Sequence, residues 1–518
     1  MEPPVFHVVW FKRDLRVRDH RPLWEAAQRG RVLPLYIVEP SVVQAADYEA
    51  RHWAFIRESL EDLRADLAGL GQPLVVRVGE AVEVFQRLHA AAGRFHLWAH
   101  QETGTALTYA RDRAVRAWAH EQGLTFTEYP QRGVVRTLRD RDTWAAQFDA
   151  YMTAPEARVP EAMPRLPNVR LGPLPTGADL GLSPTVLAAR QPGGAAAGQA
   201  TLRTFLAERG ADYHRKLSSP LTAPDHCSRL SPHLAWGTLS LRQVIQAARQ
   251  QRQAVRSWPP ARRGGWPRAL AAFESRLHWH GHFMQKLESD PRIETESFVT
   301  TYDGVRTHDA ARFEAWQAGC TGYPMVDAAM RSLTATGYLN FRMRALLVSF
   351  AAYDLWLDWR SFHHVLARRW LDYEPGIHLS QVQMQSGTSG INTLRIYNPT
   401  KQAQDHDPEG EFIRRWIPEL EGVPKAFIHT PWLMTKAVQQ ASGCRLGATY
   451  PMPVVDHAQA ARQAKARITQ VRAWPETQAQ AAAVLDKHGS RRGKRRAQAR
   501  HRPPPRPRGD VDQQSLPL

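Results

Sequence analysis

Short apolar runs alternate with helix-like segments over the first 130 residues of the chain. Each run has five to seven residues, which is typical of strands that are buried on both faces. Between the runs, segments such as 53–70 and 107–122 repeat apolar side chains at helical spacing. The alternation predicts an α/β domain over residues 1–130 with a doubly wound parallel sheet. The predicted strands are 6–11, 32–38, 73–78, 95–99 and 124–129.

A helical pattern follows the α/β region after a long interruption. Residues 131–198 are rich in proline, glycine and alanine, which predicts a connector that crosses the surface between two domains. From residue 199 to 474 the strand signals are few, so this region is predicted to be an all-helical domain. Its last helix is expected at 456–471.

Charge is distributed unevenly along the chain. The net charge is +18, and residues 487–508 alone hold ten lysines and arginines without an acidic residue, which leaves +8 for the rest. This balance favours nucleic acid or another polyanion as a partner. The segment 475–518 has too few apolar residues to pack, so it is predicted to be a basic, disordered tail.

Several classes of protein are excluded. The three cysteines, Cys227, Cys320 and Cys444, are far apart, which excludes a disulfide framework and a four-cysteine iron–sulfur cluster on this chain alone. No G-x-G-x-x-G motif follows the first strand, so a Rossmann site is not supported. His278 and His282 have zinc-ligand spacing without an evident third ligand, and no metal site is expected. No long uncharged apolar run occurs, so we expect no membrane span and a cytoplasmic location.

Five motifs carry a family resemblance. The chain reads WFKRDLRVRD at 10–19, CSRLSPHLAWG at 227–237, GCTGYPMVDAAMR at 319–331, RIYNP at 395–399 and DPEGEFIRRW at 407–416. In this order they resemble the photolyase/cryptochrome family, in an atypical branch. The resemblance implies an N-terminal antenna domain, a C-terminal helical domain that holds a U-shaped FAD, and a function driven by blue light.

The same match implies which residues bind FAD. Ser228 and Ser231 lie near a predicted helix start, where free backbone N–H groups favour a phosphate. Cys227 stands where the family usually has threonine, so one hydroxyl contact is lost. Arg344 and Asp372 match an ion pair beside the flavin ring, which would stabilise an anionic reduced flavin. The residues assigned to FAD are Tyr213, Cys227, Ser228, Arg229, Leu230, Ser231, Arg344, Asp372, Tyr373, Glu374 and His378.

The segment that aligns with the family's lesion-contacting helix departs from the family pattern. Residues 276, 279, 280 and 283 should share one helical face, on which Trp279 either stacks on a base or packs in the core. Arg276 replaces the usual glutamate with a cation that can donate hydrogen bonds, stabilise an anion or hold a phosphate. The expected DNA contacts are Arg276, Trp279, His280, Phe283, Phe341, Arg342 and Lys401.

The tryptophan chain that passes electrons to flavin in the family is incomplete here. Trp359 matches its middle member, but Arg306 occupies the outer position and residues 378–388 contain no tryptophan. Trp356 and Trp370 are candidates for another path. By the resemblance, His378 stands where the family commonly has an asparagine or a similar residue facing flavin N5, and it is expected to donate a hydrogen bond or a proton. The expected catalytic residues are Arg276, Trp279, His378 and Trp359.

Three functions stay open, and repair is placed first. It would be an FAD-dependent, blue-light-driven photolyase, a lyase that repairs UV-damaged DNA by electron transfer from reduced flavin. The second is a cryptochrome-like photoreceptor without repair activity, which would need a signalling partner. The third is a DNA- or RNA-binding flavoprotein with little photochemistry. We expect a monomer, and an antenna chromophore (a folate or a deazaflavin) is a further cofactor candidate, with Glu102 as its carboxylate contact.

Overall fold

The computed structural model describes residues 6–185, 187 and 189–489. Its N-terminal part is a parallel five-stranded sheet with the order β3-β2-β1-β4-β5. From β1 the chain adds β2 and then β3 towards one edge of the sheet. It then crosses back to place β4 on the other side of β1, with β5 at the opposite edge, which is the doubly wound arrangement. The predicted α/β domain is confirmed. The strands are β1 (Phe6–Phe11), β2 (Val32–Val38), β3 (Val75–Val78), β4 (Phe95–His100) and β5 (Phe126–Tyr129).

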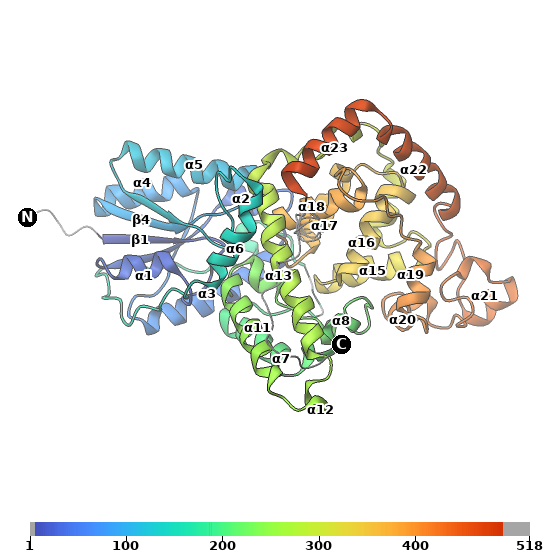
Figure 1. Ribbon diagram of the computed structural model, residues 1–518, viewed down its shortest axis with the longest axis horizontal. Coiled ribbons are helices and arrows are strands. Elements are labelled where there is room, and N and C mark those ends of the chain that lie inside the picture. Colours follow the sequence, from blue (N-terminus) through green and yellow to red (C-terminus); the bar gives the residue numbers. More distant parts are fainter. Residues whose placement is uncertain (1–5, 186, 188, 490–518) are drawn as a thin grey trace, which may run out of the picture.

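Strand β1 shows why the sequence pattern is continuous rather than alternating. Val8 and Trp10 pack on one face of the sheet, whereas Val9 and Phe11 pack on the other. Helices cover both faces (Figure 1), so each side chain of the strand is buried and selected to be apolar. The covering helices are α1 (Arg21–Ala27), α3 (Ala50–Gly69), α4 (Ala81–Ala92) and α5 (Ala106–Glu121), and a short helix α2 (Pro40–Val43) precedes α3.

The described residues from 199 to 474 are largely helical, as predicted, and their largest buried cluster lies among α15, α16, α17 and α18. None of the helices in the described part of the chain is long and apolar enough to cross a membrane. The helices are α7 (Ala195–Ala207), α8 (Tyr213–Lys216), α9 (Ala223–His226), α10 (Ser231–Ala235), α11 (Leu241–Arg256), α12 (Pro260–Arg263), α13 (Trp266–Ser289), α14 (Ala310–Ala318), α15 (Pro324–Thr336), α16 (Phe341–Ser349), α17 (Trp359–Arg369), α18 (Pro375–Ser386), α19 (Pro399–His406), α20 (Glu411–Trp416), α21 (Lys436–Ser442), α22 (His457–Arg472) and α23 (Pro475–His488).

The connector predicted at 131–198 does more than cross the surface. It contains a helix, α6 (Trp144–Thr153), that buries Trp144, Phe148 and Met152 in the cluster formed by α11 and α13. These three side chains recur every four residues, which is the spacing of one helical face. The sequence did not predict this helix, because the proline and glycine content of the segment masked a short amphipathic stretch.

The tail boundary predicted at residue 475 is also wrong. Helix α23 continues to His488, and both Thr477 and His488 are buried. The Thr477 hydroxyl lies 2.7 Å from the Thr301 hydroxyl, which fixes the helix to the domain. Its alanine-rich sequence has high helix propensity, so little apolar surface is needed to hold it. The remainder of the predicted tail, from residue 490, lies outside the described residues.

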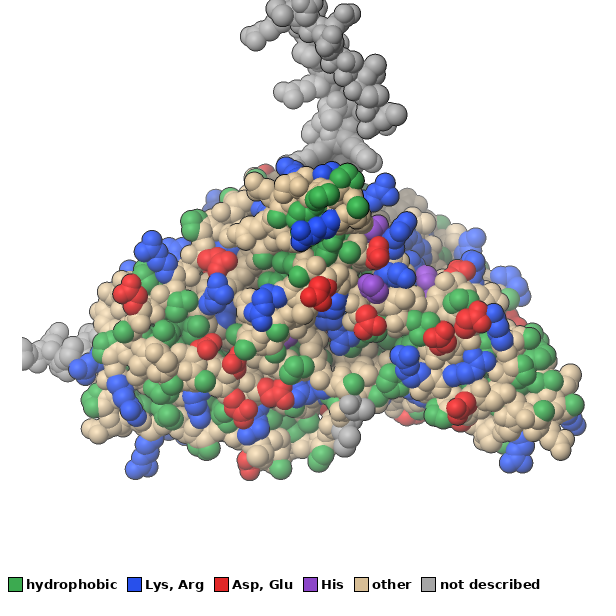
Figure 2. Space-filling model, turned by 90° about the horizontal axis from the view of Figure 1, so that it is seen from below, with side chains coloured by type: hydrophobic (Ala, Val, Ile, Leu, Met, Phe, Trp, Pro, Cys, Tyr) green, Lys and Arg blue, Asp and Glu red, His purple; other side chains and the backbone are tan. Residues whose placement is uncertain are grey.

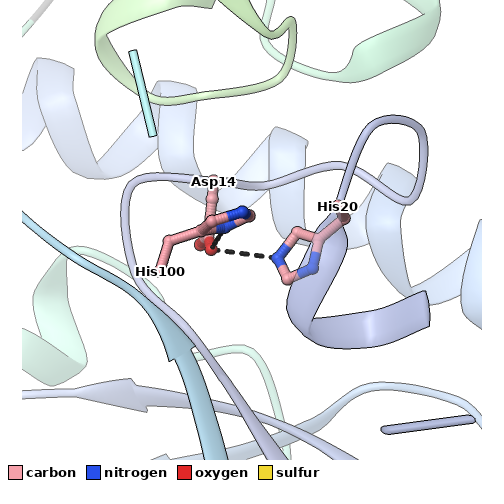
Figure 3. Close-up of side chains that lie close together, drawn as sticks. All are labelled: Asp14, His20 and His100. Carbon is pink, nitrogen blue, oxygen red and sulfur yellow. Dashed lines mark hydrogen bonds and ion pairs between the residues drawn. The ribbon is translucent and has the colours of Figure 1, made fainter. Parts of the chain in front are cut away.

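Three polar side chains meet at the carboxyl ends of β1 and β4 (Figure 3). Asp14 Oδ2 accepts hydrogen bonds from His20 Nε2 at 2.9 Å and from His100 Nδ1 at 2.8 Å. His20 Nδ1 accepts from the Leu23 backbone N–H at 3.1 Å, so Nε2 is the protonated nitrogen. The three side chains are close enough to share a metal ion, but the nitrogens that face Asp14 carry protons. The group therefore acts as a hydrogen-bonded link between two strands and α1.

Acid should weaken this domain because His100 must stay neutral. Burial lowers the pKa of His100 to about 3, from 6.5. Between these values the unfolded chain takes up a proton that the folded chain does not, so stability falls by up to about 1.4 kcal/mol per pH unit as the pH drops. His100→Asn should be less stable than the parent at neutral pH, and urea unfolding should show this difference narrowing towards about pH 5. A difference that is independent of pH would contradict the assignment.

Candidate functional site

A cavity of about 310 Å³ opens between α13, α16 and α18. Of the residues expected to bind FAD, all but Leu230 line it; Leu230 is buried in the cluster beneath α10 and α11. The prediction that residues 276, 279, 280 and 283 share one face of α13 is confirmed, since all four line this cavity. The expected DNA contacts that line the cavity are Arg276, Trp279, His280, Phe283 and Phe341.

The segment from Cys227 to Ser231 forms one end of the cavity. Arg209 holds it in place by donating hydrogen bonds to the carbonyl oxygens of Cys227 at 2.6 Å and Ser228 at 3.3 Å. Arg229 has a left-handed backbone with φ of +60°, and its guanidinium lies 3.5 Å from the centre of the Tyr338 ring. A strained backbone is maintained only where its surroundings fix it, so this arginine is held at the cavity wall. Ser231 begins α10, as the predicted helix start requires.

The thiol in this segment is neutral. Burial raises the pKa of Cys227 to about 11, which the neighbouring Tyr338 and arginines only partly oppose. A protonated thiol is a small and weak hydrogen-bond donor. Cys227 therefore contributes little charge to this end of the cavity.

Arg344 and Asp372 form a two-pronged ion pair in the cavity wall. The Arg344 Nη1 and Nη2 atoms lie 3.0 Å and 2.8 Å from the two carboxylate oxygens of Asp372. Arg344 Nε also donates to the Leu339 carbonyl oxygen at 2.8 Å. This geometry fixes the guanidinium plane, so the pair offers a rigid charged edge to the cavity.

His378 has one defined tautomer. Its Nε2 lies 3.1 Å from the His363 carbonyl oxygen, which can only accept, so Nε2 carries the proton. Burial lowers the pKa of His378 to about 3, and the ring is therefore neutral near pH 7. Its remaining nitrogen, Nδ1, is an acceptor. The expectation that His378 donates a hydrogen bond or a proton to flavin stays a prediction, and it would require Nε2 to leave the His363 carbonyl oxygen.

Two exposed aromatic rings flank Arg276 at the rim of the cavity. Trp279 is 37% exposed and Phe341 is 40% exposed, so Trp279 is not a core residue. The Arg276 guanidinium lies 4.3 Å from the Trp279 ring centre and 5.7 Å from the Phe341 ring centre. Such contacts orient a guanidinium and leave its N–H groups available. The rim thus presents two flat apolar faces and one cation.

Other expected residues lie away from the cavity. Arg342 lies 5.7 Å from the centre of the Tyr397 ring, and Lys401 forms an ion pair with Asp405 at 3.2 Å on α19. Trp359 is buried in the helical core. Their roles in DNA binding and electron transfer stay predictions.

The two tryptophans considered for another electron path both carry a cation on the ring. Trp370 lines the cavity, and the Arg344 guanidinium lies 4.1 Å from its ring centre. Trp356 has Arg306 at 4.9 Å. A positive charge at this distance opposes the removal of an electron from the ring. Electron transfer through either tryptophan stays a prediction.

The buried carboxylate of Glu374 contacts two other side chains, Arg132 and His280. It forms an ion pair with Arg132 and lies 3.2 Å from His280 Nε2. Arg132 also donates to the carbonyl oxygens of Leu234 at 3.0 Å and Ala235 at 2.8 Å. Burial alone would raise the pKa of Glu374, but the charges of Arg132 and His280 lower it to about 2. Glu374 thus joins the connector to the cavity wall.

Two residues of α3 support the cavity from the N-terminal domain. His52 Nε2 donates to the Trp370 carbonyl oxygen at 2.8 Å, and Arg51 donates to the Arg369 carbonyl oxygen at 3.1 Å. They fix the backbone just before Asp372. Neither residue could be identified from the sequence, because a histidine and an arginine at a helix start are typical of an exposed position and only domain docking buries them.

The carboxylate expected to contact an antenna chromophore is already engaged. Glu102 is buried and accepts a hydrogen bond from Arg111 at 2.7 Å, while Arg111 also binds Glu39 at 2.8 Å. The cavity beside Glu102 has a volume of only about 30 Å³. An antenna contact at Glu102 stays a prediction.

The donor set of the main cavity fits FAD. Arg229 and Arg276 form no ion pair with any carboxylate in the described part of the chain, so both can meet a pyrophosphate or another anion. Among the described residues, the buried oxygens Asn340 Oδ1 and Gln381 Oε1 have no hydrogen-bond partner, and both residues line the cavity. Buried acceptors of this kind require donors, which the amino and hydroxyl groups of a bound FAD would supply.

Known proteins give the same assignment. A family model described as the FAD binding domain of DNA photolyase matches residues 273–470, and a DNA photolyase model matches residues 7–167. A cryptochrome DASH from Gloeobacter violaceus is 30% identical over 88% of this chain and 94% of its own. A deoxyribodipyrimidine photo-lyase from Escherichia coli is 30% identical over 88% and 96%. The crystal structure of a bacterial class III photolyase from Agrobacterium tumefaciens has a TM-score of 0.79 and 25% identity over 91% and 98%. The chain therefore belongs to the photolyase/cryptochrome family of FAD-binding proteins.

Proposed function

We propose that this chain is a blue-light-driven lyase that repairs pyrimidine photolesions in UV-damaged DNA. The observation that carries the proposal is the rim, where exposed Trp279 and Phe341 flank Arg276 at the mouth of a cavity that contains the Arg344–Asp372 pair. Flipped-out bases are bound by flat aromatic faces. A protein that only sensed light would not need such faces to be exposed.

The residues of the rim would bind the lesion, and the cavity wall would hold FAD beside it. When bound, FAD supplies light absorption and, in its reduced form, the electron that splits the lesion. Trp279 and Phe341 would stack on the damaged bases and keep water from the rim. Arg276 would donate hydrogen bonds to the lesion and stabilise negative charge on it. All of these residues lie on one chain, so we expect a monomer to be active.

The test uses chemically reduced protein, so that the incomplete tryptophan chain is bypassed. UV-irradiated oligothymidylate is added under blue light, and recovery of thymine absorbance is followed against a dark control. We expect recovery in the light only. No recovery, with FAD bound and reduced, would exclude repair of ordinary pyrimidine dimers.

A photoreceptor without repair is the second candidate. Arg276 is not an acid and cannot give a proton to a lesion, and the relative from Gloeobacter violaceus carries the name cryptochrome DASH. This function would require a signalling partner. A failed repair assay combined with a light-dependent change in the protease sensitivity of α22 and α23 would favour it.

A further inference from the structure

One long segment of the chain contains arginine without acid. Residues 226–273 hold eight arginines and no aspartate or glutamate. The segment includes α11, α12 and the first turns of α13. A segment of this kind within the folded part of the chain predicts contact with a polyanion.

Most of these arginines are used inside the protein. Arg249 and Arg252 each bind Glu274 at 2.7 Å, and Arg263 donates to two backbone carbonyl oxygens. Arg229 lies in the FAD cavity wall and Arg242 lies beside Asp19. Three of the eight are exposed and form no ion pair with any carboxylate in the described ranges. They are Arg256, Arg262 and Arg268, named here the arginine tip.

The arginine tip lies at one end of the helix that leads to the rim. Helix α13 begins at Trp266 and reaches Trp279 thirteen residues later, which is a rise of about 20 Å. Arg262 is stacked on the Trp258 ring, with 4.1 Å between the guanidinium and the ring centre. Its position is therefore defined rather than free.

A second basic segment lies between the arginine tip and the cavity. The backbone at Gly265 is so close to residues 211–214 that a Cβ there would stand 2.6 Å from the Ala211 carbonyl oxygen. The contacted segment continues into Tyr213 in the cavity wall and Arg215, which is exposed. Positive side chains thus occur at the rim, next to Tyr213, and at the tip.

The surface as a whole does not explain this arrangement. Figure 2 shows the molecule from below, which is the end at which α12 lies in Figure 1. Lys and Arg are mixed with Asp and Glu over most of that face. General attraction of DNA to a basic protein would not favour one group of arginines over another. The arginine tip differs from this mixed surface because its three side chains form no ion pair among the described residues and lie at a defined distance from the rim.

We propose that the arginine tip binds backbone phosphates of the damaged DNA about six nucleotides from the lesion, since about 20 Å spans that many phosphates at 3.4 Å each. The inference rests on the proposed function, because it takes the lesion to lie at the rim. Guanidinium groups bind phosphate oxygens with paired hydrogen bonds. Such contacts carry no sequence information and position the duplex.

The test compares the holoprotein with the triple variant Arg256→Ala, Arg262→Ala, Arg268→Ala. The probe is a duplex of about 24 base pairs with one central thymine dimer, and binding is followed by fluorescence anisotropy from about 50 to 200 mM salt. Loss of three phosphate contacts should reduce the salt slope by up to about 2.7, so the parent loses about 40-fold more affinity than the variant over this range. A duplex with neutral methylphosphonate linkages about five to seven nucleotides from the dimer should bind the parent and the variant alike.

A matched control separates local contact from total charge. The variant Arg31→Ala, Arg113→Ala, Arg158→Ala removes three exposed arginines elsewhere and should keep the parental slope. Equal slopes for the parent and the tip variant, or equal changes in both triple variants, would overturn the proposal. Failure of the repair assay would count against the proposed function alone, because the salt slope measures the tip contact whether or not light repairs the dimer.

Discussion

Replacing Glu374 with glutamine should lower the free energy of unfolding by about 3–5 kcal/mol, because the variant leaves the Arg132 charge buried without its partner. Both side chains are buried. Arg132 is also bound to the carbonyl oxygens of Leu234 and Ala235, so it cannot turn to solvent without breaking those hydrogen bonds. The loss should be measured by urea unfolding followed by circular dichroism, together with the FAD content of the purified protein.

A matched control is Glu419→Gln. It breaks the Arg331–Glu419 pair, whose side chains are 22% and 31% exposed, and should cost less than about 1 kcal/mol. The double variant Arg132→Met, Glu374→Leu should recover much of the lost stability, because it removes both charges together. Equal losses for Glu374→Gln and Glu419→Gln would mean that the buried pair contributes no more than a surface pair.

The sheet could be predicted from sequence because each strand is buried on both faces. The bounds predicted for β1 and β2 match the structure, whereas β3 and β5 begin two residues later than predicted. Leu74 and Leu124 explain the difference, since both are buried but precede the paired residues of their strands. Apolar runs report burial, and strand bounds also depend on hydrogen bonding between strands.

The candidate site could be predicted only as far as its motifs reach. Family motifs identified residues that the structure brings to one cavity, including the α13 face with Arg276 and Trp279. They gave no sign of Arg132, which lies 242 residues from Glu374 in the chain within a segment read as a connector. The tautomer of His378 was equally inaccessible, because it depends on the position of the His363 carbonyl oxygen. Pairings between distant segments leave no local pattern.

Arg276→Gln should reduce the rate of light-driven dimer splitting by about 10- to 100-fold, which is less than the roughly 100- to 1000-fold cost of removing a charge-stabilising donor altogether. Glutamine keeps a hydrogen-bond donor but loses the positive charge. The guanidinium is already oriented by Trp279 and Phe341, so little reorganisation is needed when negative charge appears on the lesion. The rate should be measured in single turnovers of reduced holoprotein, with binding of the dimer measured separately.

The comparison with Trp279→Ala decides what Arg276 does. Loss of the indole should weaken dimer binding by about 1–3 kcal/mol, the value of one base–aromatic stack, and change the splitting rate of bound dimer much less. Arg276→Lys keeps the charge and should recover part of the rate lost in Arg276→Gln. If Arg276→Gln instead weakened binding and left the splitting rate unchanged, its role would be to hold Trp279 or a phosphate. An electrostatic role requires the opposite result, with the rate lowered while the bound fraction is preserved.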